Sequence, residues 1–382
     1  MATITDYTTK SGKKYYKFQL YVGTDPLTGR RIKTTRSKFR NKKEAEIALS
    51  RLQLEIEENG FNKVGSELFE ELAQIWLKTY KNTVKESTYV KTNELFKHHI
   101  IPSLGKFRID KITIHECQNE INKWFQKLKN FRVVRMYASK VFDLAIRMEI
   151  IKQNPMNMVV VPQIIINPLE EEKINYYTKE QLMEFLNYTK QENNLKRYTY
   201  FRLLAFSGVR RSEALALTWR DVDFTNQTIK ITKNLARGEN SKLIITTPKT
   251  RKSVRTIKMD KVTMNDLNKW KKQQKAELTM LAVDHKKTEQ LVFNNNLNEH
   301  IQISKPLHWL RRIQKKYKLH EITVHGFRHT HASLLFEAGV SIKEASDRLG
   351  HSDIRTTMNI YTHVTAKTKD KVAQKLESYM NF

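Results

Sequence analysis

The hydrophobic and polar positions of the chain first follow a strand pattern and then a helical one. The run Y-Y-K-F-Q-L-Y-V alternates apolar and polar residues, as a half-buried strand does. A turn marked by Pro26 and Gly29 separates it from a further strand-like run, R-I-K-T-T-R-S-K-F. A helical run begins after Asn41, a favourable N-cap, and ends at Gly60. Residues 1–60 are therefore predicted to form a small β-sheet followed by one helix.

The following segment, residues 65–163, has helical spacing of its apolar residues throughout. Its first helix carries an apolar stripe on one side, made of Leu68, Leu72, Ile75 and Trp76. A second run, K-E-S-T-Y-V-K-T-N-E-L-F-K-H-H-I, is expected to end at Pro102 and Gly105. Two more helical runs begin at I-H-E-C and R-V-V-R, and N-P-M-N-M-V-V-V-P closes the segment. We therefore expect an all-helical domain here.

From residue 175 to 382, helical runs surround a stretch that is rich in strand-forming residues. Thr178 followed by Gln181 is a capping-box pattern at the start of a helix. Ile229 and Ile231 alternate with polar residues in the first of three strand-like runs, N-Q-T-I-K-I-T-K, K-L-I-I-T-T-P-K and V-R-T-I-K-M. A last helix is expected to carry an apolar side made of Val372, Leu376, Tyr379 and Met380. The predicted fold class is α+β multidomain, with a mainly helical third domain that contains a small antiparallel β-sheet.

The charge of the chain favours a polyanionic partner. The formal net charge is +29 over 382 residues. The first 43 residues carry 12 Lys or Arg against Asp6 and Asp25, and the helix that follows is much more acidic. Positive charge is therefore concentrated on the predicted N-terminal sheet, whose exposed face could enter a DNA major groove. A basic sheet that only increases solubility is the alternative.

Other compositional features argue against a membrane or secreted protein. The most apolar window, M-V-V-V-P-Q-I-I-I, is short and interrupted by Pro162 and Gln163. The N-terminal residues lack the apolar core of a signal peptide. Cys117 is the one cysteine, so an intrachain disulfide cannot form, and a reducing cytosol is the expected setting.

Residues suited to phosphate chemistry are concentrated in the last quarter of the chain. The run T-V-H-G-F-R-H-T-H contains His325 and Arg328, L-G-H-S-D contains His351, and N-I-Y-T-H contains Tyr361. Upstream, F-S-G-V-R-R-S-E places two further candidates three residues apart on one helix face, and T-P-K-T-R-K places a lysine between two strands; these are Arg210, Glu213 and Lys249.

These residue types supply what a phosphodiester needs when a side chain attacks it without a metal. A tyrosine hydroxyl has a pKa near 10, so it is a poor nucleophile at neutral pH unless a base or nearby cations activate it. The planar fork of an arginine binds two phosphate oxygens at once, which a lysine cannot do. Two arginines, a histidine base and a tyrosine nucleophile therefore form a plausible set.

The order Arg, Lys, His-x-x-Arg, His, Tyr resembles the catalytic signature of the tyrosine recombinase (phage integrase) family, and the N-terminal sheet resembles the arm domain of integrases from phages and conjugative transposons. The resemblance implies that Tyr361 attacks the scissile phosphate, forms a 3′-phosphotyrosyl link and releases a 5′-hydroxyl. Arg210 and Arg328 would hold the non-bridging oxygens and offset charge in the transition state. Lys249 would protonate the leaving 5′-oxygen as general acid.

The same resemblance implies supporting roles for the other three residues. His325 would accept or relay the Tyr361 proton, and His351 would donate a hydrogen bond to the phosphate. Glu213 would lie behind the arginines and fix their geometry. We expect no cofactor and no metal, and rejoining would need no ATP because the phosphotyrosyl link stores the bond energy.

The resemblance also implies a division of labour along the chain. Residues 1–60 would be an arm-type DNA-binding domain, residues 65–163 a helical core-binding domain, and residues 175–382 the catalytic domain with a C-terminal helix that docks onto a neighbouring protomer. The protein would act as a homotetramer on double-stranded DNA, at arm-type and core-type attachment sites, through a Holliday junction. It would integrate and excise a mobile element in a bacterial cytoplasm, with accessory DNA-bending and excision proteins.

Three other interpretations are weaker. A type IB topoisomerase shares the phosphotyrosine chemistry, but relaxing DNA does not call for an arm-binding unit. A DNA-binding regulator built on the same fold would have no need for the nucleophile. A zinc site made of His329, His331 and His363 lacks any accompanying cysteine, and His329 and His331 are two residues apart, so they point to different helix faces.

Overall fold

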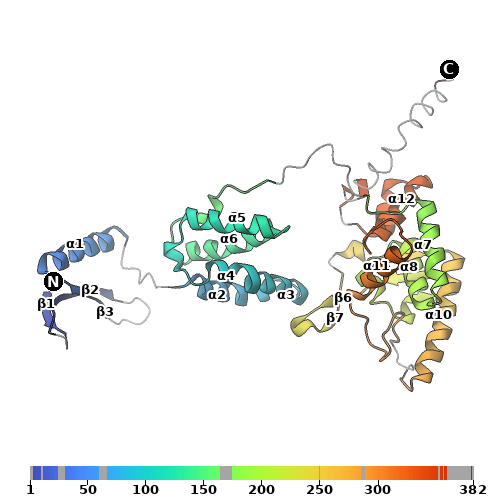
Figure 1. Cartoon of the computed structure of the whole chain (residues 1–382), viewed down its shortest axis with the longest axis horizontal. Helices are drawn as coiled ribbons and strands as arrows, with labels where there is room; N and C mark the ends of the chain where they lie inside the picture. The colour runs from blue at the N-terminus through green and yellow to red at the C-terminus, as the bar shows by residue number, and fades with distance from the viewer. Residues whose placement is uncertain are drawn as a thin grey trace. The chain divides into compact units, whose positions relative to one another are not determined.

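The structure is a computed structural model of the chain (Figure 1). It describes residues 3–9, 12–24, 31–59, 67–163, 174–248, 250–284, 289–351, 353–355, 357–358 and 380. The chain divides into two compact units, Met1–Ile165 and Ile166–Phe382. The predicted α+β class is confirmed, with an N-terminal sheet, a helical segment, and a mainly helical C-terminal unit that contains short strands. The division into three domains stays a prediction.

The N-terminal sheet has three antiparallel strands in the order β1-β2-β3. They are β1 (Thr3–Thr8), β2 (Lys14–Thr24) and β3 (Arg31–Phe39), and α1 (Lys42–Asn59) follows them. Phe18 and Leu20 of β2 pack with Ala45 of α1 in a small apolar cluster. The Asn41 side chain accepts a hydrogen bond from the Glu44 backbone N–H at 2.7 Å, which confirms the predicted N-cap.

Strand β1 is absent from the sequence-based prediction because it lies at the edge of the sheet. Four of its six residues are exposed and only Ile4 and Tyr7 are half-buried, so its apolar pattern is too sparse to predict a strand.

The helical segment of the first unit has its own apolar core. Its elements are α2 (Phe69–Lys81), α3 (Glu86–Leu95), a π-helical turn (Phe96–Ile100), α4 (Ile101–Leu104), α5 (Ile114–Lys127) and α6 (Phe131–Arg147). The predicted stripe of α2 is wrong at Ile75, which is 46% exposed, whereas Phe69 and Ala73 are buried with Leu72 and Trp76. The buried face therefore shares Leu72 and Trp76 with the predicted stripe but is completed by Phe69 and Ala73 instead of Ile75.

The prediction that this helical run ends at Pro102 and Gly105 is confirmed at Gly105 and wrong at Pro102. Pro102 lies inside α4, which runs to Leu104, and Gly105 is the C-cap. A proline removes one N–H and its ring crowds the carbonyl four residues earlier. The π-helical turn before it widens the helix, with the Ile101 N–H donating to the Phe96 carbonyl five residues back. The extra residue in that turn accommodates the proline without a break.

The second unit is mainly helical with two small antiparallel sheets. Its helices are α7 (Lys179–Gln191), α8 (Leu195–Ser207), α9 (Arg211–Ala214), α10 (Lys261–Met280), α11 (Lys305–Lys316), α12 (Gly326–Glu337) and α13 (Ile342–Leu349). Thr178 and Gln181 form the predicted capping box, each side chain bonded to the other residue's backbone N–H. This part of the sequence prediction is confirmed.

The strands of this unit divide differently from the prediction. One sheet pairs β4 (Val222–Asp223), β5 (Thr228–Ile231) and β8 (Arg255–Lys258), and a separate hairpin pairs β6 (Asn234–Arg237) with β7 (Leu243–Thr246). Ile229 and Ile231 are buried as expected. The expected second strand, β7, pairs with β6, which was not predicted because Leu235 is its only buried residue and its pattern is weak.

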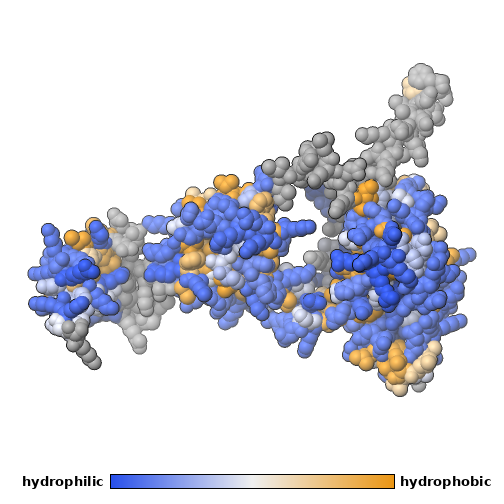
Figure 2. All heavy atoms as spheres, in the orientation of Figure 1, coloured by the Kyte–Doolittle hydropathy of each residue, from blue (hydrophilic) through white to orange (hydrophobic). Residues whose placement is uncertain are grey.

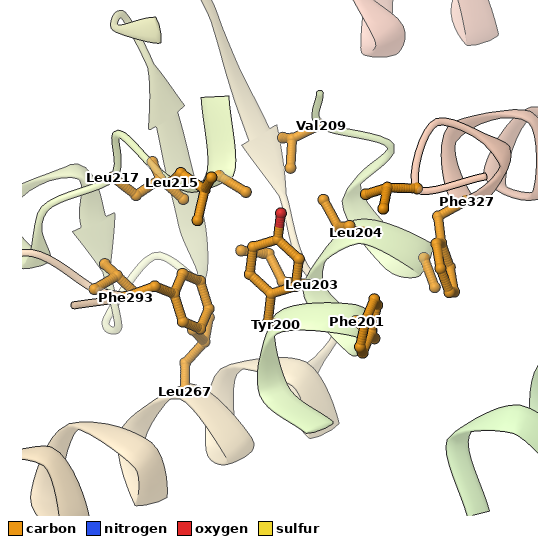
Figure 3. Close-up of a cluster of buried hydrophobic side chains, with 14 of the residues drawn as sticks. Tyr200, Phe201, Leu203, Leu204, Val209, Leu215, Leu217, Leu267, Phe293 and Phe327 are labelled. Carbon is orange, nitrogen blue, oxygen red and sulfur yellow. The ribbon is translucent and has the colours of Figure 1, made fainter. Parts of the chain in front are cut away.

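Helix α8 lies at the centre of the core of this unit. Its buried side chains include Tyr200, Phe201, Leu203 and Leu204. They pack in one cluster with Leu267 of α10, Phe327 of α12, and Leu215, Leu217 and Phe293 from the segments between helices (Figure 3). Val209 and Phe327 belong to the same cluster, and each directly precedes a predicted catalytic arginine. Core packing therefore fixes the backbone from which both arginines project.

The surface is mostly hydrophilic on the face that Figure 2 shows. An apolar patch marks the end of α10, where Met280 is 87% and Leu281 is 53% exposed. Of the helices that the structure describes, none combines the length and the apolar character needed to cross a bilayer.

Cys117 is buried, and burial raises the pKa of its thiol to about 12, which keeps the thiol protonated and unreactive.

Two adjacent valines of α6 test the helical core. Val134 is fully buried and Val133 is 40% exposed. We expect Val134→Ala to lower the free energy of unfolding by about 2 kcal/mol, through lost apolar burial and the cavity left behind. Val133→Ala brings the same gain in helix propensity but removes no buried group, so its free energy of unfolding should stay within about 0.5 kcal/mol of the wild-type value. Urea unfolding of the full chain measures both, and equal losses would contradict the core assignment.

Candidate active site

Five of the seven predicted site residues lie in the described part of the chain. Arg210 directly precedes α9, His325 precedes α12, and Arg328 lies in the first turn of α12. His351 follows Gly350, which ends α13. The fifth, Glu213, belongs to α9. The predicted general acid and nucleophile, Lys249 and Tyr361, lie outside the described residues.

Glu213 is buried and holds two arginines. Its carboxylate accepts from Arg210 Nη1 at 2.7 Å and from the Arg210 backbone N–H at 2.9 Å. On its other side it accepts from Arg255 Nη2 at 2.9 Å and Nη1 at 3.3 Å. Burial alone would raise the pKa of Glu213, but the hydrogen bonds and charges of Arg255 and Arg210 lower it overall, so the carboxylate is ionised at neutral pH.

Three guanidinium groups converge on the C-terminal end of α13. Arg255 Nε donates to the carbonyl of Arg348 at 2.9 Å, and Arg328 Nη2 donates to the carbonyl of Leu349 at 2.7 Å. Arg210 Nη2 donates to the carbonyl of Gly350 at 3.4 Å. Carbonyls at a helix C-terminus have no partners within the helix and carry partial negative charge. The helix end therefore binds arginines that come from three separate segments.

Arg328 is almost fully buried, at 2% exposure, and its other contacts are also neutral groups. Nη1 donates to the Gly208 carbonyl at 2.8 Å, and Nε donates to His351 Nε2 at 3.3 Å. Burial, and then the charges of Arg210 and Arg255, lower the pKa of Arg328 to about 9, which leaves it charged at neutral pH. In the part of the chain described, no carboxylate forms an ion pair with this buried cation.

His351 is held by contacts to both ring nitrogens. Because Nε2 accepts from Arg328, Nδ1 carries the hydrogen and donates to Thr357 Oγ1 at 2.7 Å. Burial, and then the charges of Arg328 and Arg210, lower the pKa of His351 to about 3, so the ring is neutral at physiological pH. Both nitrogens are engaged here, so a hydrogen bond from His351 to a phosphate stays a prediction.

His325 is more open to solvent than its neighbours in α12. Its ring meets the ring of His329 edge to face, with centroids 4.8 Å apart. Partial desolvation, and then the charges of His329 and Arg328, lower the pKa of His325 to about 4. A neutral imidazole at the open edge of the arginine cluster is able to accept a proton, as its predicted role requires.

The balance of charge makes this site suited to an anion. Among the described residues, Glu213 is the one carboxylate paired with this cluster, and it bonds to Arg210 and Arg255 but not to Arg328. Three positive charges therefore face one negative charge. The histidines beside them are neutral. A bound phosphodiester would supply the negative charge that the buried cations lack. In the described ranges no cluster of three or more His, Cys, Asp or Glu side chains could hold a metal ion.

Two glycines permit this close packing. Gly208 (φ 65°) and Gly350 (φ 69°) end α8 and α13 in the left-handed conformation. A Cβ on Gly350 would lie 2.9 Å from the Lys252 carbonyl oxygen and 3.0 Å from Arg255 Cδ. The turns that lead to Arg210 and His351 therefore both require glycine.

Comparison with known proteins identifies the family. Residues 175–368 match the Phage integrase family. The chain belongs to the phage integrase family, the tyrosine recombinases. Residues 68–125 match the N-terminal SAM-like domain of phage integrases, and residues 6–56 match an arm DNA-binding domain. The predicted family and enzyme class are confirmed.

Relatives and solved structures agree with this family. The chain is 28% identical over 371 residues to the ICEBs1 integrase of Bacillus subtilis, covering 96% of this chain and 97% of the relative. It is 24% identical over 336 residues to the transposase of transposon Tn916 from Enterococcus faecalis, covering 83% and 79%.

Two solved structures show the same fold. The Tn1549 transposon integrase, in complex with a circular intermediate DNA, has a TM-score of 0.65 and 22% identity, covering 81% of this chain and 99% of that one. A lambda integrase tetramer bound to a Holliday junction has a TM-score of 0.56 and 16% identity, covering 93% and 94%.

Sequence reasoning missed Arg255. It lies two residues before buried Ile257, on the same face of β8, and its side chain is only 7% exposed although the strand reads as exposed and basic. The available signal was weak: an arginine at a position where the alternation of the strand predicts an inward side chain. Its partner Glu213 is 42 residues earlier, so spacing could not connect them.

Gly350→Ala tests the close approach at the end of α13. Both Gly350 and Gly339 have positive φ (69° and 83°), but a Cβ on Gly339 meets nothing within 4 Å. We expect each alanine variant to lose about 1–2 kcal/mol of stability from the strained backbone. Only Gly350→Ala should also lose cleavage of a nicked DNA duplex, by an order of magnitude or more, because it displaces Arg255 and His351. Equal cleavage by both variants would contradict this role.

Buried neutral histidines make stability depend on pH. Burial, and then the charge of Arg348, lower the pKa of His331 to about 3, below the ordinary value of 6.5. Between these values the unfolded chain binds the proton and the folded chain does not, so stability is highest above pH 6.5 and falls on acidification. The slope is roughly 1.4 kcal/mol per pH unit for each such histidine.

Urea unfolding between about pH 7 and pH 5 measures this slope. His331→Gln should flatten it by the contribution of one proton, whereas the same change at exposed His308 should leave it unchanged. A slope that His331→Gln does not alter would show that His331 is not buried as a neutral ring.

Proposed function

We propose that this tyrosine recombinase cuts and rejoins double-stranded DNA, and that it integrates and excises a mobile genetic element. The observation that carries the proposal is the excess of guanidinium charge at half-buried Arg210 and buried Arg328, beside neutral His325 and His351. Such a site binds a phosphodiester and accepts a proton without a metal. The names of the relatives, integrases and transposases of phages and conjugative elements, support the biological role.

The proposed reaction is a transfer of the phosphoryl group from a DNA oxygen to tyrosine. The Tyr361 hydroxyl attacks the phosphorus and its proton passes to His325. The bond from phosphorus to the 5′-oxygen breaks, and Lys249 gives that oxygen a proton. The product is a 3′-phosphotyrosyl link and a free 5′-hydroxyl, and the reverse reaction with another strand completes the exchange.

The arginines and Glu213 divide the remaining work in this proposal. Arg210 and Arg328 bind the non-bridging oxygens and offset the charge that builds during attack. Glu213 fixes Arg210 from behind through its bonds at 2.7 and 2.9 Å. His351, held by Arg328, would turn its Nδ1–H from Thr357 to the phosphate when DNA is bound.

The other parts of the chain would bring the site to its DNA. We propose three domains: residues 1–60 bind arm-type sites, residues 65–163 bind core-type sites, and residues 175–382 are catalytic. Binding through separate domains raises affinity by effective concentration. The basic sheet supports a DNA contact, and the match to an arm DNA-binding domain favours it over a solubilising surface.

The proposed active assembly is a homotetramer on two duplexes that passes through a Holliday junction in the bacterial cytoplasm, with accessory DNA-bending and excision proteins. The lambda integrase structure, a tetramer on a Holliday junction, is the precedent for the assembly. The predicted apolar side of Val372, Leu376, Tyr379 and Met380, of which the first three lie outside the described residues, would dock onto the next protomer. Undiminished synapsis by a chain that lacks these residues would argue against the docking.

Replacement of the nucleophile tests the chemistry. Wild-type protein incubated in EDTA with nicked duplexes from a candidate attachment site should give a covalent protein–DNA band on a denaturing gel. Tyr361→Phe should abolish the band and keep DNA binding, because only the attacking oxygen is removed. Tyr188→Phe, a control on α7, should retain it.

The same assay distinguishes the alternative functions. A covalent band that persists in Tyr361→Phe would overturn the assignment of the nucleophile. DNA binding without any band in the wild type, even with host extract, would favour a DNA-binding regulator. Relaxation of supercoiled DNA without strand exchange between two sites would favour a topoisomerase.

A further inference from the structure

A buried pair of side chains lies directly behind the active site and takes no part in the reaction described above. Arg348 Nε, from the last turn of α13, donates to His331 Nε2 in α12 at 3.0 Å. His331 is 6% exposed, and its Nδ1 lies 2.8 Å from the Ala205 carbonyl oxygen. Because Nε2 accepts, Nδ1 carries the hydrogen and donates to that carbonyl. The contacts therefore require a neutral ring with one defined tautomer.

The pair joins the C-terminal ends of two helices. Arg348 Nη2 donates to the Phe206 carbonyl at 3.1 Å, so both members of the pair bind carbonyls in the last turn of α8. Carbonyls in the last turn of a helix receive no hydrogen bond from a backbone N–H of the same helix. The backbone of Arg348 itself belongs to the end of α13. One histidine and one arginine thus hold the two helix ends against each other.

The two helix ends carry the acceptors of the catalytic arginine. Arg328 Nη1 donates to Gly208 O, just after α8, and Nη2 donates to Leu349 O, at the end of α13. The packing between them leaves no free space, since a Cβ on Gly208 would lie 2.7 Å from both His331 Cδ2 and Leu349 Cδ2. A change in the separation of the helix ends must therefore move the acceptors that orient Arg328.

The segments that leave these helix ends carry other parts of the site. Arg210 follows α8 by three residues, and His351 follows α13 by two. From these contacts we propose that His331 and Arg348 form a positioning pair, which fixes the separation of the ends of α8 and α13 and so aligns Arg328 and His351 with Arg210. This inference rests on the proposed function, because the alignment matters only for phosphoryl transfer.

Matched variants separate the hydrogen bonds of the pair from its bulk. Arg348→Met keeps an unbranched apolar stem as far as the position of Nε and removes both donors, whereas Arg348→Gln keeps an N–H at that position. His331→Leu removes the acceptor, whereas His331→Gln keeps one. Lys343→Met, which removes an exposed positive charge from the same helix, is the control for charge loss.

The measurement is single-turnover cleavage of a nicked duplex by the full chain at saturating DNA, together with the Kd for the same duplex and the melting temperature. Arg348→Met and His331→Leu should lower the rate constant at least about tenfold, because misplacement by an ångström has effects of this size. Their Kd should change less than about twofold, as expected for an interaction that acts after binding. The two glutamine variants should recover most of the rate.

The amplitude of the reaction separates positioning from simple structural damage. Loss of folded protein lowers the amplitude and the melting temperature, whereas a displaced Arg328 lowers the rate constant of the protein that remains active. Wild-type rate constants in Arg348→Met and His331→Leu, or glutamine variants no faster than these, would overturn the proposal. If Arg348→Met does not fold, the comparison of His331→Leu with His331→Gln decides it. Absence of cleavage by the wild type would instead count against the proposed function.

Discussion

The C-terminal carbonyls of α13 are the anchor on which the catalytic site depends. Any helix ends in carbonyls that lack partners within the helix and carry partial negative charge. In this chain the carbonyls of three successive residues, 348 to 350, each accept from a different arginine, Arg255, Arg328 and Arg210. The arginines come from β8, α12 and the start of α9. One helix end therefore gathers groups that the chain supplies from three places.

The same arrangement sets the electrostatics of the site. Carbonyl dipoles solvate the guanidinium groups but do not neutralise them, and Glu213 offsets only part of their charge. Burial is the main reason why His325 and His351 are neutral, and the positive charge of Arg328 and Arg210 lowers the pKa of each ring further. The arginine charge thus favours a bound phosphate and adds to the burial that keeps the histidines neutral.

Local sequence signals predicted those elements whose structure is decided locally. The Asn41 cap, the capping box at Thr178 and the alternation of Ile229 and Ile231 are all confirmed, because each depends on residues within one turn or one strand. The failures occurred where packing decides. Ile75 fits a helical stripe but faces solvent. Pro102 normally ends a helix, yet a preceding π-helical turn keeps it inside one.

The sequence by itself determined the family, the fold class and the ordered set of candidate residues, because these follow from residue types and their order along the chain. It could not reveal that Arg255 supports Glu213 or that His331 holds Arg348. Their hydrogen bonds join separate segments of the chain: Arg255 lies 42 residues after Glu213, and Arg348 lies 17 residues after His331. Only the packing of α8, α12 and α13 brings these groups within bonding distance. The tertiary structure therefore decided how the site is held, since side-chain to backbone bonds depend on helix positions that no local pattern encodes.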